Sequence, residues 1–259
     1  MTDGIGFGFE PDDDLDDFEP NEESHRRRLV LLLFDLSGSM GVTRNAVRPV
    51  DSLNTHIERW LPQVHERGAD ELRNVEFAVL TFGSKTVRLH APGGRVEFGE
   101  DGAATTGQVP QDGGFMPAAK LRIDRFTAGG TTPMVSALRV ALRLGDERAA
   151  ALGAAGVTTG PVRLILFTDG SPNDKNLPRD AWHEVAADLA ERREKRRTHL
   201  LAFGVPESDD RVLRALAGDR GYFPLSGFDF GKLLELITIA SSAHDPYDGL
   251  RSLFEDEQA

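Results

Sequence analysis

The sequence predicts an α/β protein with a doubly wound, mostly parallel central sheet, helices on both faces and one short antiparallel edge strand. Two observations predict it. Short runs dominated by apolar residues, Leu29–Phe34 and Val162–Phe167, are closed by turn residues, which is typical of strands buried on both faces. Helical patterns separate the strands, and such alternation favours parallel pairing. The chain has 259 residues and no cysteine, which excludes disulfides, thiolate metal sites and cysteine nucleophiles.

The first half of the chain supplies one helix and three strands. After the first strand, apolar residues three and four apart predict an amphipathic helix over 42–65, with Pro49 near its start, where a missing N–H is tolerated. Further strands are predicted at 75–82 and at 86–90, the latter at an edge of the sheet. Residues 91–118 contain seven glycines and three prolines, which predicts a long surface loop with room for a small hairpin.

The second half alternates helix and strand more regularly. The expected elements are a helix at 133–152, a strand at 162–167, a helix at 179–196, a strand at 199–204, a helix at 209–217, a short strand at 222–224 and a helix at 230–241. The basic run 192–197 ends one of these helices. We interpret it as a solvated helix end whose cations favour the helix dipole. A short helix at 250–254 is also compatible with the sequence.

Negative charge is concentrated in the first 24 residues, which contain ten acids and no Lys or Arg. This composition predicts a disordered acidic tail over 1–27, followed by an α/β domain over 28–242 and an acidic C-terminal tail over 243–259. Beyond residue 24, 32 acids face 30 bases, so the body lacks the basic stripe that nucleic-acid binding requires. The N-terminus lacks signal-peptide character, and the most apolar run has six residues, whereas a membrane helix needs about 20. We expect a cytoplasmic protein with no nucleic-acid or membrane partner.

Three polar clusters lie at what we predict to be strand ends. They are Asp35-Leu36-Ser37-Gly38-Ser39, Gly129-Gly130-Thr131-Thr132 and Thr168-Asp169-Gly170-Ser171. Ligands of open α/β sheets bind outside the carboxyl ends of the strands. Carboxylates and hydroxyls are hard oxygen donors that suit Mg²⁺ or Mn²⁺ better than zinc. Taken singly, these residues are ordinary helix caps and turns, but the three clusters together favour a metal site.

Together these motifs resemble the von Willebrand factor A (vWA) domain and its metal-ion-dependent adhesion site (MIDAS). The resemblance covers roughly residues 28–241, with the motifs in the family's order and at comparable spacing. It implies the metal ligands Asp35, Ser37, Ser39, Thr132 and Asp169. Thr132 is preferred to Thr131 because the family's ligand threonine stands five residues before an Ala-Leu pair, here 137–138. The Leu-Ser-Gly-Ser-Met turn and the Ala-Gly-Gly-Thr loop look like the bacterial tellurium-resistance TerY-like group. The Gly-rich loop and the acidic tail look like additions to the family's minimal pattern.

The resemblance implies a binding module and not an enzyme. In the family, the metal keeps an open coordination position that accepts a carboxylate from a protein partner. Similarity to the TerY-like group implies a stress-response, tellurium-resistance or defence system with a protein kinase and a phosphatase as partners. Two alternatives stay open, an adaptor for an AAA+ ATPase and a serine hydrolase that uses Ser39 with Asp169 and His199. The hydrolase is disfavoured because its nucleophile elbow needs Gly-x-Ser-x-Gly, and residue 37 is Ser.

The acidic tail also carries the apolar residues Phe7, Phe9, Leu15 and Phe18. We consider a solubilising segment, a docking motif that inserts aromatic residues into a partner, and an internal competitor whose carboxylate takes the metal's open position. Partner docking is favoured over self-inhibition, because stable intramolecular closure must offset the entropy of ordering the segment.

Overall fold

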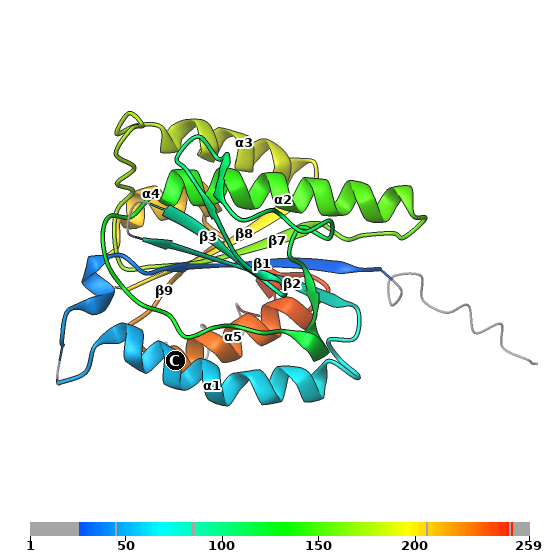
Figure 1. The fold of residues 1–259 in the computed structure, drawn as a ribbon. Helices are drawn as coiled ribbons and strands as arrows, with labels where there is room; N and C mark the ends of the chain where they lie inside the picture. The colour runs from blue at the N-terminus through cyan, green and yellow to red at the C-terminus, as the bar shows by residue number, and fades with distance from the viewer. Residues whose placement is uncertain (1–25, 45, 84–85, 206, 249, 251–259) are drawn as a thin grey trace, which may run out of the picture.

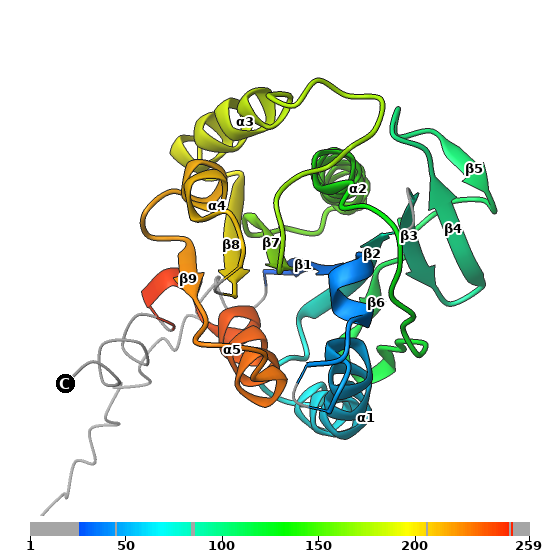
Figure 2. The ribbon, with the colours of Figure 1, turned by 90° about the vertical axis from the view of Figure 1, so that its left-hand side faces the viewer.

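The structure is a computed structural model that describes residues 26–44, 46–83, 86–205, 207–248 and 250. Within these residues a nine-stranded sheet is covered by helices on both faces (Figures 1 and 2). The strands are β1 (Arg28–Asp35), β2 (Val75–Gly83), β3 (Thr86–Ala91), β4 (Gly94–Phe98), β5 (Ala104–Thr106), β6 (Met116–Pro117), β7 (Val162–Thr168), β8 (Thr198–Gly204) and β9 (Tyr222–Pro224). The α-helices are α1 (Pro49–Arg67), α2 (Met134–Ala154), α3 (Trp182–Glu194), α4 (Asp210–Ala217) and α5 (Phe230–Ser242). The predicted fold class is confirmed.

The sheet has a parallel centre and an antiparallel extension. Its order is β5-β4-β3-β2-β1-β7-β8-β9, with β6 paired to β2. The pairs from β2 through β1, β7 and β8 to β9 are parallel, whereas β3, β4 and β5 pair antiparallel. The predicted strand at 86–90 therefore exists but is not at the edge. The Gly-rich segment adds β4 through a tight turn in which Ala91 pairs with Gly94, and the flanking glycines hide its alternation of exposed and buried residues in the sequence.

Alternate residues of β1 enter two separate hydrophobic clusters. Leu29, Leu31 and Leu33 pack with residues of α2, α3 and α4, whereas the residues between them pack with α1 and α5. Successive side chains of a strand point to opposite faces, so a strand covered on both sides is apolar at nearly every position. Figure 2 shows the two groups of helices on either side of the sheet.

The helix after β1 begins later than predicted. Arg48 is extended, with φ −85° and ψ 131°, as the residue before a proline prefers, and Pro49 then starts α1. Arg44 and Val47 exchange backbone hydrogen bonds of 2.8 and 3.0 Å, so the segment before α1 is a turn and not helix. This turn leaves Val42 55% and Val47 51% exposed. The other four helices begin and end within three residues of their predicted positions.

The chain after α5 packs onto the domain. Tyr247 is 5% exposed, and Leu250 is fully buried. Buried Arg163 of β7 donates hydrogen bonds to three backbone carbonyls at and beyond the end of α5. The predicted acidic tail up to residue 25 and nearly all of the predicted helix at 250–254 lie outside the described residues, and the domain limits stay a prediction. No helix in the described part of the chain is long and apolar enough to span a membrane.

Candidate metal centre

The three polar clusters meet at the carboxyl edge of the parallel strands. Asp35 ends β1, Asp169 directly follows β7, and Thr132 lies two residues before α2. Residues 121–131 form no strand, so the prediction of a strand end before Gly129 is wrong. β1 and β7 are parallel neighbours, with Phe34 opposite Phe167, so the residues that follow them emerge side by side. The topology thus brings together three residues, Asp35, Thr132 and Asp169, that are 37 to 134 positions apart in the sequence.

Backbone contacts hold the segment before α2 against the turn that follows β1. Gly129 N–H donates to the Leu36 carbonyl at 2.8 Å, and Gly38 N–H donates to the Gly130 carbonyl at 3.1 Å. Gly130 has a φ of 75°, which glycine adopts without steric cost. At the end of β2, a Cβ on Gly83 would lie 2.6 Å from the Leu36 carbonyl oxygen. Small residues therefore permit the close approach that builds this edge.

The carboxylate of Asp35 is fully buried and accepts a hydrogen bond on each oxygen. Ser37 N–H donates to Oδ1 at 2.8 Å, and the Thr168 hydroxyl donates to Oδ2 at 2.6 Å. Burial nevertheless raises the pKa of Asp35 to about 6. Burial disfavours the charged form of this carboxylate, and a cation nearby would stabilise that charged form.

Ser37, Ser39 and Asp169 form a hydrogen-bonded row. The two serine Oγ atoms are 3.0 Å apart, and Ser39 Oγ donates to Asp169 Oδ1 at 2.8 Å. Asp169 Oδ2 is buried and has no hydrogen-bond partner in the described structure, and burial also raises the pKa of Asp169. A buried acceptor without a partner is costly. A bound cation would satisfy it, so the residues present suit the metal that the motifs imply.

Thr132 lies beside the Asp169 segment. It is buried, its Oγ1 is 3.6 Å from the position of a Cβ on Gly170, and its carbonyl accepts from Asn173 N–H at 2.8 Å. The hydroxyl of Thr131 is buried without a hydrogen-bond partner among the described residues. The assignment of Thr132 as the ligand stays a prediction.

Asp174 positions this site, although no sequence pattern indicated it. Its carboxylate accepts from the N–H groups of Val135 and Ser136 at 3.1 and 2.9 Å, and it lies 39 and 38 residues from them in the chain. It thus caps the first turn of α2 and fastens the segment after Asp169 to the helix that follows Thr132. A cap supplied from so far along the chain has no local signal.

The ligand atoms that this edge offers to a metal are oxygen atoms. No cluster of three or more His, Asp or Glu side chains that could hold a metal ion occurs in the described residues. The edge instead offers two carboxylates, Asp35 and Asp169, with serine and threonine hydroxyls. Mg²⁺ and Mn²⁺ accept such hard oxygens and retain water ligands in the remaining positions.

The residues of the alternative hydrolase are not assembled. In the parallel pairing of β7 and β8, His199 lies opposite Arg163, five residues before the Thr168 position, which is about 17 Å along the strand. His199 Nδ1 instead pairs with the Tyr247 hydroxyl at 3.2 Å. Ser39 donates directly to Asp169, and no histidine of the described residues forms a hydrogen bond with this serine.

Comparison with solved structures gives relatives in fold. The pilus adhesin SpaC from Lactobacillus rhamnosus GG is 15% identical, with a TM-score of 0.51, over 81% of this chain and 30% of that chain. Proximal thread matrix protein 1 from the mussel byssus is 17% identical, with a TM-score of 0.49, over 83% of this chain and 48% of that chain. One structure of the mussel protein has a zinc-occupied MIDAS motif. The vWF domain of the type V pili tip protein Mfa5 from Porphyromonas gingivalis is 11% identical, with a TM-score of 0.47, over 85% of this chain and 98% of that chain.

Of the neighbours named above, SpaC has a TM-score above 0.5, and its likeness to this chain is one of fold. The Mfa5 vWF domain and the SpRpn10 VWA domain have TM-scores of 0.47 and 0.45. At these identities the likeness concerns the fold alone. The chain spans about half or less of the length of SpaC and the mussel protein. Its sequence matches no family model and no curated protein.

Proposed function

We propose that this chain is a divalent-metal-dependent protein-interaction module. Mg²⁺ or Mn²⁺ would be held at the carboxyl edge by Asp35, Ser37, Ser39, Thr132 and Asp169. The observation that carries the proposal is the row of two serine hydroxyls that ends at Asp169, whose Oδ2 is buried without a partner. When bound, the metal supplies a positive centre with an open position for a carboxylate of a partner protein.

The residues of the edge have separable roles in this proposal. Asp35 orients the turn through its bond from Ser37 N–H and contributes negative charge. The serine and threonine hydroxyls add oxygen ligands without charge, so the cation is not over-neutralised and still attracts an acidic side chain. Asp174 holds the Asp169 segment against α2.

Residues 42–44 and 46–48, before α1, are the proposed contact surface around the acidic side chain of the partner. Its Val42 and Val47 are the large hydrophobic side chains that the described residues leave exposed. Arg44 of the same surface is paired with Glu207 and lies 5.0 Å from the ring centroid of Phe228. An apolar surface next to a charged centre suits a partner that presents an acid among apolar residues.

The finer proposal concerns the partner and its setting. The resemblance of the turn and loop motifs to the TerY-like group supports a protein kinase or phosphatase as partner, in a cytoplasmic stress-response, tellurium-resistance or defence system. An AAA+ ATPase is the alternative partner, and the same metal site would serve it. Binding assays with the proteins encoded by neighbouring genes distinguish the two.

Titration calorimetry with Mg²⁺, Mn²⁺ and Zn²⁺ tests the metal site. We expect one site with Mg²⁺ or Mn²⁺ that is lost in Asp35→Ala and Asp169→Asn and retained in Asp70→Asn, an exposed acid remote in sequence from the edge. Far-UV circular dichroism should show that all variants fold, because the edge residues do not fill the core. Absence of metal binding by the parent chain would contradict the proposal. Binding of the partner protein should disappear when a chelator removes the metal and in the variant Asp169→Asn. Partner binding that is unaffected by both the chelator and the substitution would contradict the proposed interaction role.

A further inference from the structure

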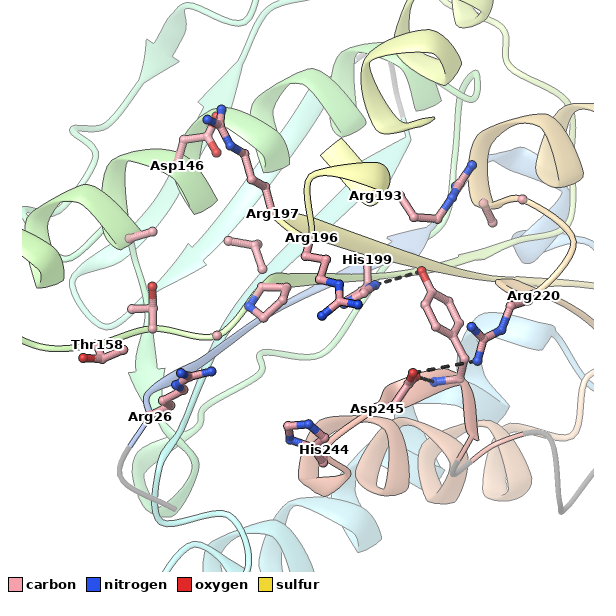
Figure 3. A pocket seen from close by; sticks show the side chains of 18 of the residues that line it. Arg26, Asp146, Thr158, Arg193, Arg196, Arg197, His199, Arg220, His244 and Asp245 are labelled. Atoms are coloured by element: carbon pink, nitrogen blue, oxygen red, sulfur yellow. Dashed lines mark hydrogen bonds and ion pairs between the residues drawn. The ribbon is translucent and has the colours of Figure 1, made fainter. Parts of the chain in front are cut away.

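A second polar site lies at the opposite end of the sheet from the candidate metal centre. A cavity of about 1230 Å³ opens beside the amino ends of β7 and β8 (Figure 3). Its walls come from the end of α3, the segment after α5, the loop after α2 and the start of the described chain. We call it the basic pocket, because five arginines line it, namely Arg26, Arg193, Arg196, Arg197 and Arg220.

The five arginines outnumber the three acids of the wall, which are Asp146, Asp219 and Asp245. Asp146 is paired with Arg192 at 2.9 Å, and Asp245 lies 3.8 Å from Arg220. Asp219 forms no ion pair with the residues that the structure describes. The other four arginines of the basic pocket form no ion pair within the described part of the chain. Burial and the nearby charge of Arg163 lower the pKa of His199 to about 4, so this histidine is neutral at pH 7.

Backbone contacts fix the segment 193–197, which carries three of these arginines. Arg196 has a φ of 51°, a left-handed conformation that reverses the chain just after α3. Arg196 N–H donates to the Arg193 carbonyl at 3.0 Å, and the Arg197 carbonyl accepts from Val162 N–H at 2.9 Å. The basic run at the end of α3 is thus built into a pocket wall as well as ending a helix.

The acidic N-terminal segment is attached directly to the basic pocket. Arg27 N–H donates to the Thr158 carbonyl at 2.9 Å, and the Arg27 carbonyl accepts from Gly160 N–H at 3.0 Å. These bonds fix Arg26 in the wall, and ten acids lie between residues 3 and 23 of the sequence. An extended chain spans about 3.3–3.6 Å per residue, so acids three to ten positions before Arg26 reach every part of the cavity.

We propose that the basic pocket binds an acidic peptide segment and that its occupant is residues 10–23 of the same chain. The arginines come from three separate segments, which suits several carboxylates along an extended peptide better than one compact phosphate (Figure 3). The tether adds a high effective concentration to the charge attraction. Because the pocket lies at the amino ends of the strands, a tail bound there leaves the candidate metal site accessible. A tail carboxylate bound at the metal itself would instead block that site.

Distance measurement between spin labels tests the proposal in the full chain. The chain has no cysteine, so Leu15→Cys and Ala151→Cys accept two labels without interference. At low salt we expect a narrow distance distribution for the parent. It should broaden and lengthen in the variant Arg193→Gln, Arg196→Gly, Arg197→Gln, where glycine suits the left-handed position, and at 0.5 M salt, where surface charges are screened.

A matched control removes three exposed arginines that do not line the basic pocket, by Arg59→Gln, Arg122→Gln and Arg211→Gln. Melting curves of both triple variants should remain cooperative. An unchanged distribution in the pocket variant, or equal broadening in the control, would overturn the proposal. So would loss of the short distance on dilution with unlabelled chain, which would show a second copy as the occupant. A broad parent distribution with inorganic phosphate binding that the pocket variant loses would assign the pocket to phosphate instead.

Discussion

Asp35 is a carboxylate that the fold removes from water. Two short hydrogen bonds hold it, yet burial still raises its pKa to about 6. The hydrogen bonds favour the charged form, and the loss of hydration opposes it more strongly. The charged carboxylate of Asp35 therefore lowers the stability of the folded state and favours binding of a cation. Such shifted pKa values are common at functional sites.

The pH dependence of stability should reveal this cost. The folded chain holds the Asp35 proton more tightly than the unfolded chain, so the metal-free protein should lose stability as pH rises from the ordinary pKa of 3.8 to about 6. The contribution is on the order of 2–3 kcal/mol. Asp35→Asn should remove that part of the pH slope and be more stable than the parent at pH 7 without metal. Urea unfolding of both proteins from pH 4 to 7.5 measures it, and identical slopes would show that Asp35 is not the cause.

Arg196 is a second residue that lowers the stability of the folded state, in this case through its backbone conformation. Its φ of 51° is unfavourable for a residue with a Cβ and costs about 1 kcal/mol. Arg196→Gly should therefore raise the free energy of unfolding by about 0.5–1 kcal/mol. The neighbouring Arg197→Gly, where φ is not positive, should lower it. Denaturant titration compares the two, and a loss of stability in both would mean that the Arg196 side chain outweighs its backbone strain.

At the scale of elements, the candidate site depends on how closely three segments approach. The turn after β1, the end of β2 and the segment before α2 are joined by backbone bonds at Leu36, Gly38 and Gly129. None of these contacts involves a proposed ligand side chain. The geometry of the site is therefore sensitive to residues that never touch a metal.

Gly83→Ala should disturb the candidate metal site by displacing the turn that follows β1. A Cβ there would meet the Leu36 carbonyl oxygen at 2.6 Å, so the turn that carries Ser37 and Ser39 must shift. We expect metal affinity to fall at least tenfold and stability to fall by about 1–3 kcal/mol. Gly93→Ala is the control, since nothing lies within 4 Å of its added Cβ. Calorimetry and urea unfolding provide both readouts, and unchanged affinity in Gly83→Ala would mean that the turn does not position the ligands.

At the scale of the whole molecule, the sheet carries two charged sites at its two ends. The carboxyl edge gathers acids and hydroxyls, whereas the basic pocket gathers arginines beside the amino ends of β7 and β8. A cation at the first site would join segments from both halves of the chain. Binding to the folded state alone must then stabilise the entire domain.

Metal addition should raise the melting temperature of the parent chain. At a free concentration 100 times the dissociation constant, the added stability is about 2.7 kcal/mol, which corresponds to a rise of roughly 5–10 °C in a domain of this size. Chelator should reverse the rise, and Asp169→Asn should show none. Differential scanning calorimetry with Mg²⁺ and Mn²⁺ measures it. A similar rise in Asp169→Asn would place the metal elsewhere.

The sequence by itself determined the succession of the parallel strands, the first antiparallel strand and the α-helices, and the approximate limits of most of these elements. Apolar runs such as Leu29–Phe34 are buried on both faces. A hydrophobic period of 2 or 3.6 residues can be recognised in the sequence of one element alone, without knowing which elements pack against it. It also indicated the meeting of Asp35 and Asp169, because parallel strands end at the same edge of a sheet. Whether these residues with Ser37, Ser39 and Thr132 bind a metal stays a prediction.

Only the tertiary structure decided where helix α1 begins, how far the antiparallel extension reaches and what holds the site together. The cap of α2 by Asp174 joins residues 38 and 39 positions apart. The basic pocket joins Arg26 to Arg196 and Arg220, and His199 proved to lie at the end of β8 away from Ser39. The physical reason is the same in each case. Periodicity reports what a residue does within its own element, whereas caps, pockets and close glycine contacts arise between elements that only the packed chain brings together.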